Sequence, residues 1–103
     1  MKIRMAYRIG AGGGMPRSER EIVHELCATV DLVVVVGEGA EETNRLAAAV
    51  LNRGCPLRRV ESAAQLQAGW FHGIERVGVA ADEGHRAEAR EVAEALEKLG
   101  GAR

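Results

Sequence analysis

Three pieces of sequence decide the fold: DLVVVVG at residues 31–37, NRL at 44–46 and AAQLQAGWFHGIERVGV at 63–79. The first contains a run that is apolar on both faces, which is typical of a central strand in a parallel sheet. The second opens a helix that we expect to stop at Gly54, because glycine is favoured just beyond a helix end. The third predicts a short amphipathic helix over residues 65–71, followed by a strand over residues 76–80.

The flanking sequence completes an alternating pattern of strands and helices. Residues 2–9 alternate between apolar and polar side chains, as a half-buried strand does. Ser18 and Glu21 form the capping-box pattern that starts a helix, residues 57–60 indicate a short strand, and residues 87–99 indicate the last helix. Strands and helices in this order predict helices packed on a mainly parallel sheet.

We therefore predict an α/β, three-layer domain with a four-stranded, mainly parallel sheet in the strand order 2-1-3-4. This arrangement places ligands at the carboxyl ends of the strands. One feature opposes that order, because Lys2, Arg4 and Arg8 share one face of a strand that the order makes central. Either the first strand lies nearer an edge, or that face meets solvent or a partner chain.

Composition limits the function classes. The 103 residues fit one domain, residues 1–103, whose core must consist of aliphatic side chains because aromatic residues are only 3%. Such a thin core favours a homo-oligomer. A formal net charge of −1 argues against a nucleic-acid partner. No apolar run approaches the roughly 20 residues that span a bilayer, and the amino-terminal residues do not resemble a signal peptide. We expect no membrane association and a cytoplasmic location.

The two cysteines, Cys27 and Cys55, lie neither in a CxxC pair nor at ligand spacing from a histidine. Two thiols cannot hold a four-thiolate iron–sulfur cluster within one chain. We expect reduced and mostly buried thiols. A disulfide, or a metal that bridges two chains, is the alternative. No cofactor is expected.

The order of these pieces resembles the C-terminal domain of the 4-hydroxy-3-methylbut-2-enyl diphosphate reductase (LytB) family, iron–sulfur enzymes of isoprenoid synthesis. The resemblance covers about residues 2–99 and needs no gap over residues 62–79. There the family has a Trp, a Gly and a strand that ends in VGV, and here these are Trp70, Gly73 and residues 77–79. The resemblance implies that Trp70 is mainly a packing residue.

The resemblance also implies where the family's diphosphate-binding side chains would lie. One set lies between VVG and NRL, where residues 38–43 read EGAEET and only Thr43 and Asn44 have matching chemistry. The other set follows the last strand, where residues 80–84 read AADEG and both hydroxyl groups are absent. Arg4 stands where the family has a cluster cysteine. We therefore expect the family's substrate and cluster sites to be lost.

The GAGGG loop at residues 10–14 follows a strand and precedes a capped helix, which is where phosphate-binding turns occur. Its candidate ligand-binding residues are Gly10, Gly12 and Gly13, with the flanking arginines Arg8 and Arg17. Met15 stands where a dinucleotide fingerprint has its third glycine, so a flexible turn is the alternative. His85 is a further candidate ligand contact. A general-base role is conceivable for it, but no nucleophile is evident beside it.

Five carboxylates follow two strands at the same predicted edge of the sheet: Glu38, Glu41, Glu42, Asp82 and Glu83. Hard cations prefer carboxylate ligands, so this group is a candidate metal site. Its spacing matches no established metal loop. Glutamates near a helix N-terminus are also ordinary stabilisers, and here they would repel a diphosphate.

These observations favour a stand-alone, non-catalytic relative of the reductase's C-terminal domain. It would act as a small-ligand-binding or assembly module, and not as an enzyme on its own. One alternative is a subunit of a split isoprenoid-diphosphate reductase that works with a cluster-bearing partner chain. A second alternative is a nucleotide- or phosphate-binding protein that uses the glycine loop. Any ligand is expected to be small and anionic.

Overall fold

The computed structural model describes residues 2–7, 19–37, 41–81 and 83–101. Its elements are, in chain order, β1 (Lys2–Tyr7), α1 (Glu19–Cys27), β2 (Leu32–Val36), α2 (Glu41–Asn52), β3 (Leu57–Val60), the 3-10 turns η1 (Ala63–Gln65) and η2 (Ala68–Phe71), β4 (Arg76–Ala81), the 3-10 turn η3 (Glu83–His85) and α3 (Arg86–Gly101). The predicted α/β class is confirmed. The short helix predicted over residues 65–71 is wrong, because two separate 3-10 turns occupy that region.

The sheet has the strand order β1-β4-β2-β3, so the predicted order 2-1-3-4 is wrong. Each pairing, β1 with β4, β4 with β2 and β2 with β3, is parallel. Burial explains the order, because the two central strands have the continuous apolar runs: every residue of β2 is buried, and so is every residue of β4 after Arg76. The strands with arginines within the strand, Arg4 in β1 and Arg58 and Arg59 in β3, take the edges. The expectation that the first strand lies nearer an edge of the sheet is therefore confirmed.

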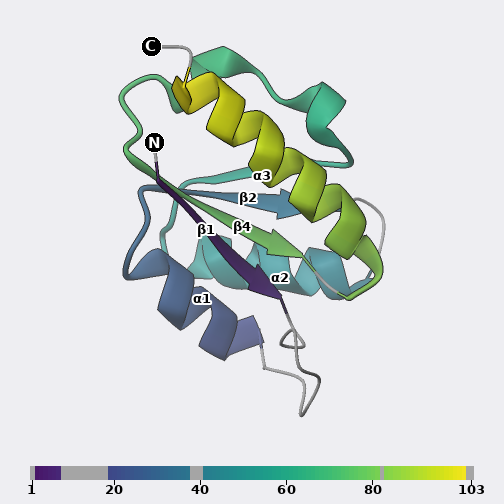
Figure 1. Cartoon of the computed structure of the whole chain (residues 1–103). Coiled ribbons are helices and arrows are strands. Elements are labelled where there is room, and N and C mark those ends of the chain that lie inside the picture. Colours follow the sequence, from purple (N-terminus) through teal and green to yellow (C-terminus); the bar gives the residue numbers. More distant parts are fainter. Residues whose placement is uncertain (1, 8–18, 38–40, 82, 102–103) are drawn as a thin grey trace.

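Helices cover both faces of the sheet and give three layers (Figure 1). α1 and α2 pack side by side on one face, over Val33 and Val35 of β2. α3 covers the other face together with η1 and η2, over Val34 and Val36. The alternation between faces is the two-residue period of a strand. Trp70 packs at the border of the α3 side, with the Arg58 guanidinium 5.0 Å from its ring centre.

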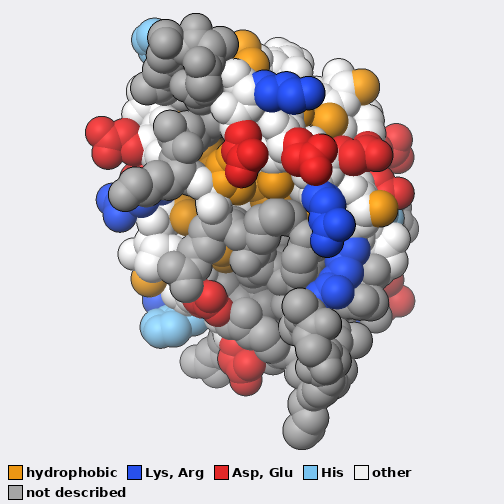
Figure 2. Space-filling view, in the orientation of Figure 1, with side chains coloured by type: hydrophobic (Ala, Val, Ile, Leu, Met, Phe, Trp, Pro, Cys, Tyr) orange, Lys and Arg blue, Asp and Glu red, His pale blue; other side chains and the backbone are white. Residues whose placement is uncertain are grey.

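The outer side of α3 is a charged surface. Figure 2 shows acidic and basic side chains beside one another over this helix, and its exposed residues include Arg90, Glu94 and Lys98, which are spaced four apart. In the described part of the chain, Leu51 is the large hydrophobic side chain left in solvent, with 61% of its surface exposed. None of the described helices combines the length and the apolar character that a membrane span requires.

Candidate functional site at the carboxyl edge of the sheet

The ends of β2 and β4 mark the candidate site. These strands are neighbours, and their last residues, Val36 and Ala81, are paired. The chain leaves β2 toward α2 on one face of the sheet and leaves β4 toward α3 on the other face (Figure 1). Adjacent parallel strands whose connections diverge in this way form a topological switch point, which is where open α/β sheets bind ligands.

Gly37 directly follows β2 and lies against the imidazole of His85. A Cβ atom at position 37 would be 3.0 Å from both Cγ and Nδ1 of that ring, which is tighter than most Cβ contacts and would require the ring to shift. The φ angle of Gly37 is 113°, in the region that favours glycine. Its N–H donates a 2.7 Å hydrogen bond to the carbonyl of Val60 at the end of β3. The ring of His85, from η3, thus lies directly over the end of β2.

Arg59 of β3 reaches across the same edge. Its Nη2 donates hydrogen bonds to the carbonyl oxygen of Gly37 at 3.2 Å and to Oδ1 of Asn44 at 2.8 Å. Asn44 lies in the first turn of α2, so one guanidinium ties the end of β2 to the start of that helix. The Nε of Arg59 is buried and makes no hydrogen bond to any residue of the described chain. The site therefore contains a cation with an N–H donor that its described neighbours leave unsatisfied.

The first turn of α2 adds polar groups of two kinds. Thr43 is fully buried and Asn44 is exposed. Of the two polar residues implied by the resemblance, Asn44 is therefore the one at the surface. The free N–H groups of a helix N-terminus carry a partial positive charge. That charge and the Arg59 guanidinium favour an anion here, whereas the exposed carboxylate of Glu41 in the same turn opposes one.

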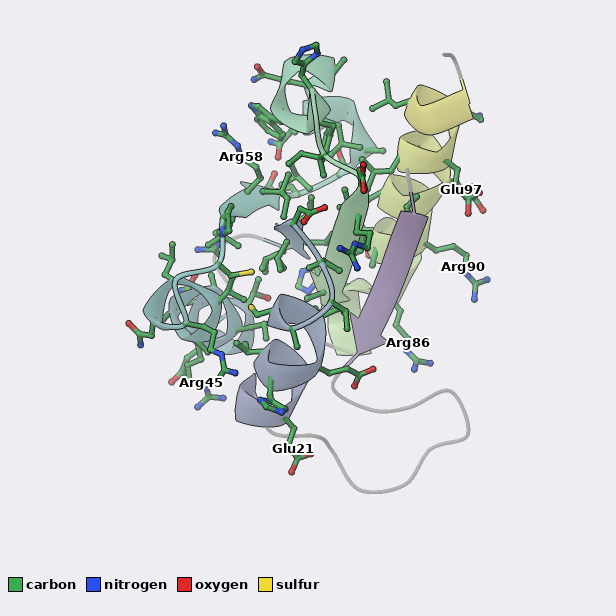
Figure 3. All side chains as sticks on the ribbon, turned by 90° about the vertical axis from the view of Figure 1, so that its left-hand side faces the viewer. Glu21, Arg45, Arg58, Arg86, Arg90 and Glu97 are labelled. Atoms are coloured by element: carbon green, nitrogen blue, oxygen red, sulfur yellow. The ribbon has the colours of Figure 1, made fainter. Side chains whose placement is uncertain are left out.

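Two further basic residues near this end belong to α3. Arg90 is exposed and points outward from that helix, away from the sheet (Figure 3), whereas Arg86, at the start of the helix, is half-buried and its Nε atom is buried. Arg45 points away from the sheet on the side of α2. Arg59 thus binds the end of β2 by hydrogen bonds, and the ring of His85 lies over the same strand end.

Many predicted candidates lie outside the described residues, namely Arg8, Gly10, Gly12, Gly13, Arg17, Glu38 and Asp82. The side chains of Glu42 and Glu83 also lie outside the description, and that of Glu41 is exposed. Among the side chains that are described, no group of three or more His, Cys, Asp or Glu residues is placed to hold a metal ion. The metal site and the glycine-loop site stay predictions.

Two residues of the edge cluster, Gly37 and Arg59, were not predicted as site residues. Gly37 was only the last residue of the stretch DLVVVVG, and Arg59 only part of the short strand predicted over residues 57–60. A signal for both exists in the sequence: a glycine ends the most apolar strand, and an arginine lies next to the last residue of a neighbouring short strand. The signal becomes specific only with the strand order, because β2 and β3 must be adjacent for Arg59 to reach Gly37.

The fold and the edge cluster define a three-layer α/β domain with a polar site at its topological switch point. The family model described as "LytB protein" matches residues 16–99. The chain therefore belongs to the LytB family.

Curated relatives agree with this assignment. The chain is 33% identical over 66 residues to a 4-hydroxy-3-methylbut-2-enyl diphosphate reductase of Pseudomonas aeruginosa strain LESB58, covering 63% of the chain and 21% of the relative. It is 37% identical over 86 residues to the enzyme of the same name from Methylibium petroleiphilum, covering 82% of the chain and 26% of that relative. The chain thus spans about a fifth to a quarter of the length of these relatives.

Solved structures give the same result. A structure of (E)-4-hydroxy-3-methyl-but-2-enyl diphosphate reductase, described as the terminal enzyme of the non-mevalonate pathway, matches with a TM-score of 0.70 and 26% identity, over 78% of the chain and 29% of that structure. The corresponding reductase from Plasmodium falciparum matches with a TM-score of 0.66 over 86% of the chain and 29% of that structure. At 13% identity, this second likeness concerns the fold alone.

Proposed function

We propose that this chain is a non-catalytic, small-ligand-binding domain of the LytB family, which holds a small anion at the carboxyl edge of β2, β3 and β4. The observation that carries the proposal is the position of Arg59. Its guanidinium lies beside the first turn of α2, is held by Gly37 and Asn44, and keeps a buried Nε donor without a described partner. An arginine next to a helix N-terminus is a common arrangement for binding phosphate or carboxylate groups.

Two observations support a role without catalysis. Arg4 stands where the resemblance places a cluster ligand. Cys27 is the last residue of α1 and precedes β2, and Cys55 follows α2 and precedes β3, so both cysteines lie toward the amino ends of the strands and away from the proposed site.

A second candidate follows from the partial coverage. The chain would be one subunit of a split isoprenoid-diphosphate reductase, whose cluster and remaining domains belong to partner chains. Assembly with a second copy of this chain, and a cytoplasmic location, are further proposals. Assembly is supported by the outward edges of β1 and β3, which pair with no other strand in the described part of the chain, because such edges are common association surfaces.

Calorimetric titration of the protein with pyrophosphate at low salt tests the anion site. We expect binding, and we expect Arg59→Gln to weaken it about ten- to a hundredfold, since a charge-assisted hydrogen bond contributes roughly 1.5–3 kcal/mol. Arg58→Gln is the matched control, because the neighbouring arginine is on the same strand and stacks on Trp70. No heat change with pyrophosphate, or equal losses in both variants, contradicts the proposal.

The same titration separates the candidates. A split-reductase subunit should prefer an isoprenoid diphosphate over pyrophosphate and should co-purify with a cluster-bearing chain. A nucleotide-binding protein should bind ATP or NAD, and Gly12→Val should abolish that binding. An assembly module should form a stable homo-oligomer in sedimentation experiments and ignore all of these anions.

A further inference from the structure

Two thiols meet between α1 and α2, at the end of the molecule opposite the proposed anion site. Cys27 is the last residue of α1 and packs against the core cluster that contains the buried Cys55. The two thiol side chains are hydrogen-bonded to each other. The sulfur atoms drawn in yellow in Figure 3 lie between the ribbons of these two helices. Both cysteines are free thiols in this structure.

Backbone geometry holds Cys55 in this position. Gly54 ends α2 with a φ of 81°, and its N–H donates to the carbonyl of Leu51 at 2.9 Å. The N–H of Cys55 donates to the carbonyl of Val50 at 3.3 Å. This pair of bonds is a Schellman motif, in which the residue after the glycine turns back onto the helix. Cys55 is therefore fixed just beyond the end of α2, where it is buried in a core cluster with Val23 and Leu26 of α1, against which Cys27 also packs.

A basic residue flanks the thiols. Burial of Cys27 and its hydrogen bond and proximity to Cys55 raise the Cys27 pKa from its ordinary 9.0 to about 12, and the nearby Arg53 opposes that rise. The Nη2 of Arg53 lies 3.2 Å from Nδ1 of His24, which fixes the guanidinium near the seam. Cys27 is partly exposed, whereas Cys55 is only 9% exposed. A reagent in solvent thus meets Cys27 first.

We propose that Cys27 and Cys55 form a reversible dithiol–disulfide couple, which when oxidised links α1 covalently to the segment after α2. A low-molecular-weight disulfide such as oxidised glutathione is the oxidant. The Cys27 thiolate attacks one sulfur of that disulfide and releases one small thiol. The Cys55 thiolate then attacks the Cys27 sulfur of the mixed disulfide and releases the second. The protein loses two protons and two electrons, and the small disulfide becomes two thiols.

This couple does not depend on the proposed anion site, because the thiols lie at the other end of the strands. Only the thiolate reacts, so the raised Cys27 pKa keeps exchange slow near neutral pH and Arg53 assists it. Among the described residues, Arg53 is the charged group that acts on the pair, and His24 contacts Arg53. The disulfide restricts the unfolded chain by closing a loop of about 29 residues, and so it stabilises the fold.

The test begins with the reduced protein and oxidised glutathione at mildly alkaline pH. After the remaining thiols are blocked with an alkylating agent, unreduced peptide mapping by mass spectrometry should find the Cys27 and Cys55 peptides linked. Both free thiols should be lost, and dithiothreitol should restore them. The melting temperature of the oxidised protein should rise by on the order of 10 °C. A linked peptide without that rise would overturn the stabilising role.

Single variants provide the controls. Cys55→Ser should stop the reaction at a glutathione adduct on Cys27, because the second thiol is missing. Cys27→Ser should remain largely unmodified and should show no rise in melting temperature. The proposal is overturned if the unsubstituted protein also stops at the adduct, or if it forms only disulfides between two chains.

Discussion

The imidazole of His85 lies so close to Gly37 that a Cβ atom at position 37 would be 3.0 Å from its Cγ. This contact joins the turn after β4 to the end of β2, two segments that are far apart in the sequence and adjacent at the sheet edge. Position 37 requires glycine for two separate reasons. A Cβ atom would press against the His85 ring, and the φ of 113° is unfavourable for other residues. This contact therefore gives a sharp test of the site geometry.

We expect Gly37→Ala to lower the free energy of unfolding by about 1–3 kcal/mol, because the new methyl group strains the backbone and displaces the His85 ring. Urea unfolding followed by circular dichroism measures the effect. Gly69→Ala is the control, since a Cβ at Gly69 meets no atom within 4 Å. The double variant Gly37→Ala with His85→Ala should recover part of the loss. Equal stability of Gly37→Ala and Gly69→Ala would contradict the close contact between ring and backbone.

The hydrogen bond between Arg59 and Asn44 should appear as an energetic coupling. A cycle of Arg59→Gln, Asn44→Ala and the double variant should give a coupling of about 0.5–1 kcal/mol, because the bond is charge-assisted but lies at an exposed site. Chemical denaturation at low salt provides the values. Strict additivity of the two single effects would show that the 2.8 Å contact contributes nothing in solution.

A buried leucine and an exposed leucine together test whether α3 packs on the sheet. Leu96 of α3 is fully buried, whereas 61% of Leu51 is exposed. Leu96→Ala should cost about 3–4 kcal/mol through lost burial and the cavity left behind. Leu51→Ala should change the unfolding free energy by less than about 0.5 kcal/mol. Similar costs for the two variants would mean that α3 does not pack on the sheet as described.

The Cys27 pKa makes stability depend on pH in the alkaline range. The folded thiol titrates near 12, and the unfolded thiol near its ordinary 9.0. Between these values the unfolded state releases its proton first, so the free energy of unfolding should fall as pH rises from about 9 toward about 12. Below about pH 9, the contribution of the Cys27 thiol to the free energy of unfolding is fully present. Reduced Cys27→Ser should show a shallower decline in unfolding experiments, and parallel curves would refute the raised pKa.

Arg53 should control the rate at which Cys27 reacts. Arg53→Gln removes the cation that opposes the rise in the thiol pKa, so the initial reaction with oxidised glutathione should slow severalfold at constant pH. The rate is followed by quenching samples and counting free thiols. Arg58→Gln removes a different arginine, stacked on Trp70, and should leave the rate unchanged. An unaltered rate in Arg53→Gln would remove this residue from the mechanism.

Local patterns predicted the elements better than their arrangement. The run at residues 32–36 was recognisable as a buried strand, and Gly54 as a helix stop, because both signals depend on a few neighbouring residues. The strand order was predicted wrongly because a common order was preferred over the charge pattern of β1. Lys2, Arg4 and the arginines of β3 already indicated which strands lie at the edges.

The candidate site was only partly predictable for a related reason. Asn44 was predicted from the resemblance, and His85 as a further candidate ligand contact, but their partners come from other elements. Arg59 reaches Asn44, and Gly37 meets His85, only because β3 and β4 flank β2. The proximity of Cys27 and Cys55 likewise depends on how α1 and α2 pack, which the spacing of two cysteines does not reveal.

The central place of β4 has a consequence for how the chain reaches this fold. β4 lies between β1 and β2, yet it is the last strand in the sequence, and Lys2 pairs with Arg76. A growing or truncated chain that ends before Arg76 leaves β1 with no neighbour and one edge of the apolar β2 open. Pairing between segments so distant in sequence slows folding, and open edges of this kind invite aggregation. Synthesis of the last third of the chain is thus the step that allows the sheet to close.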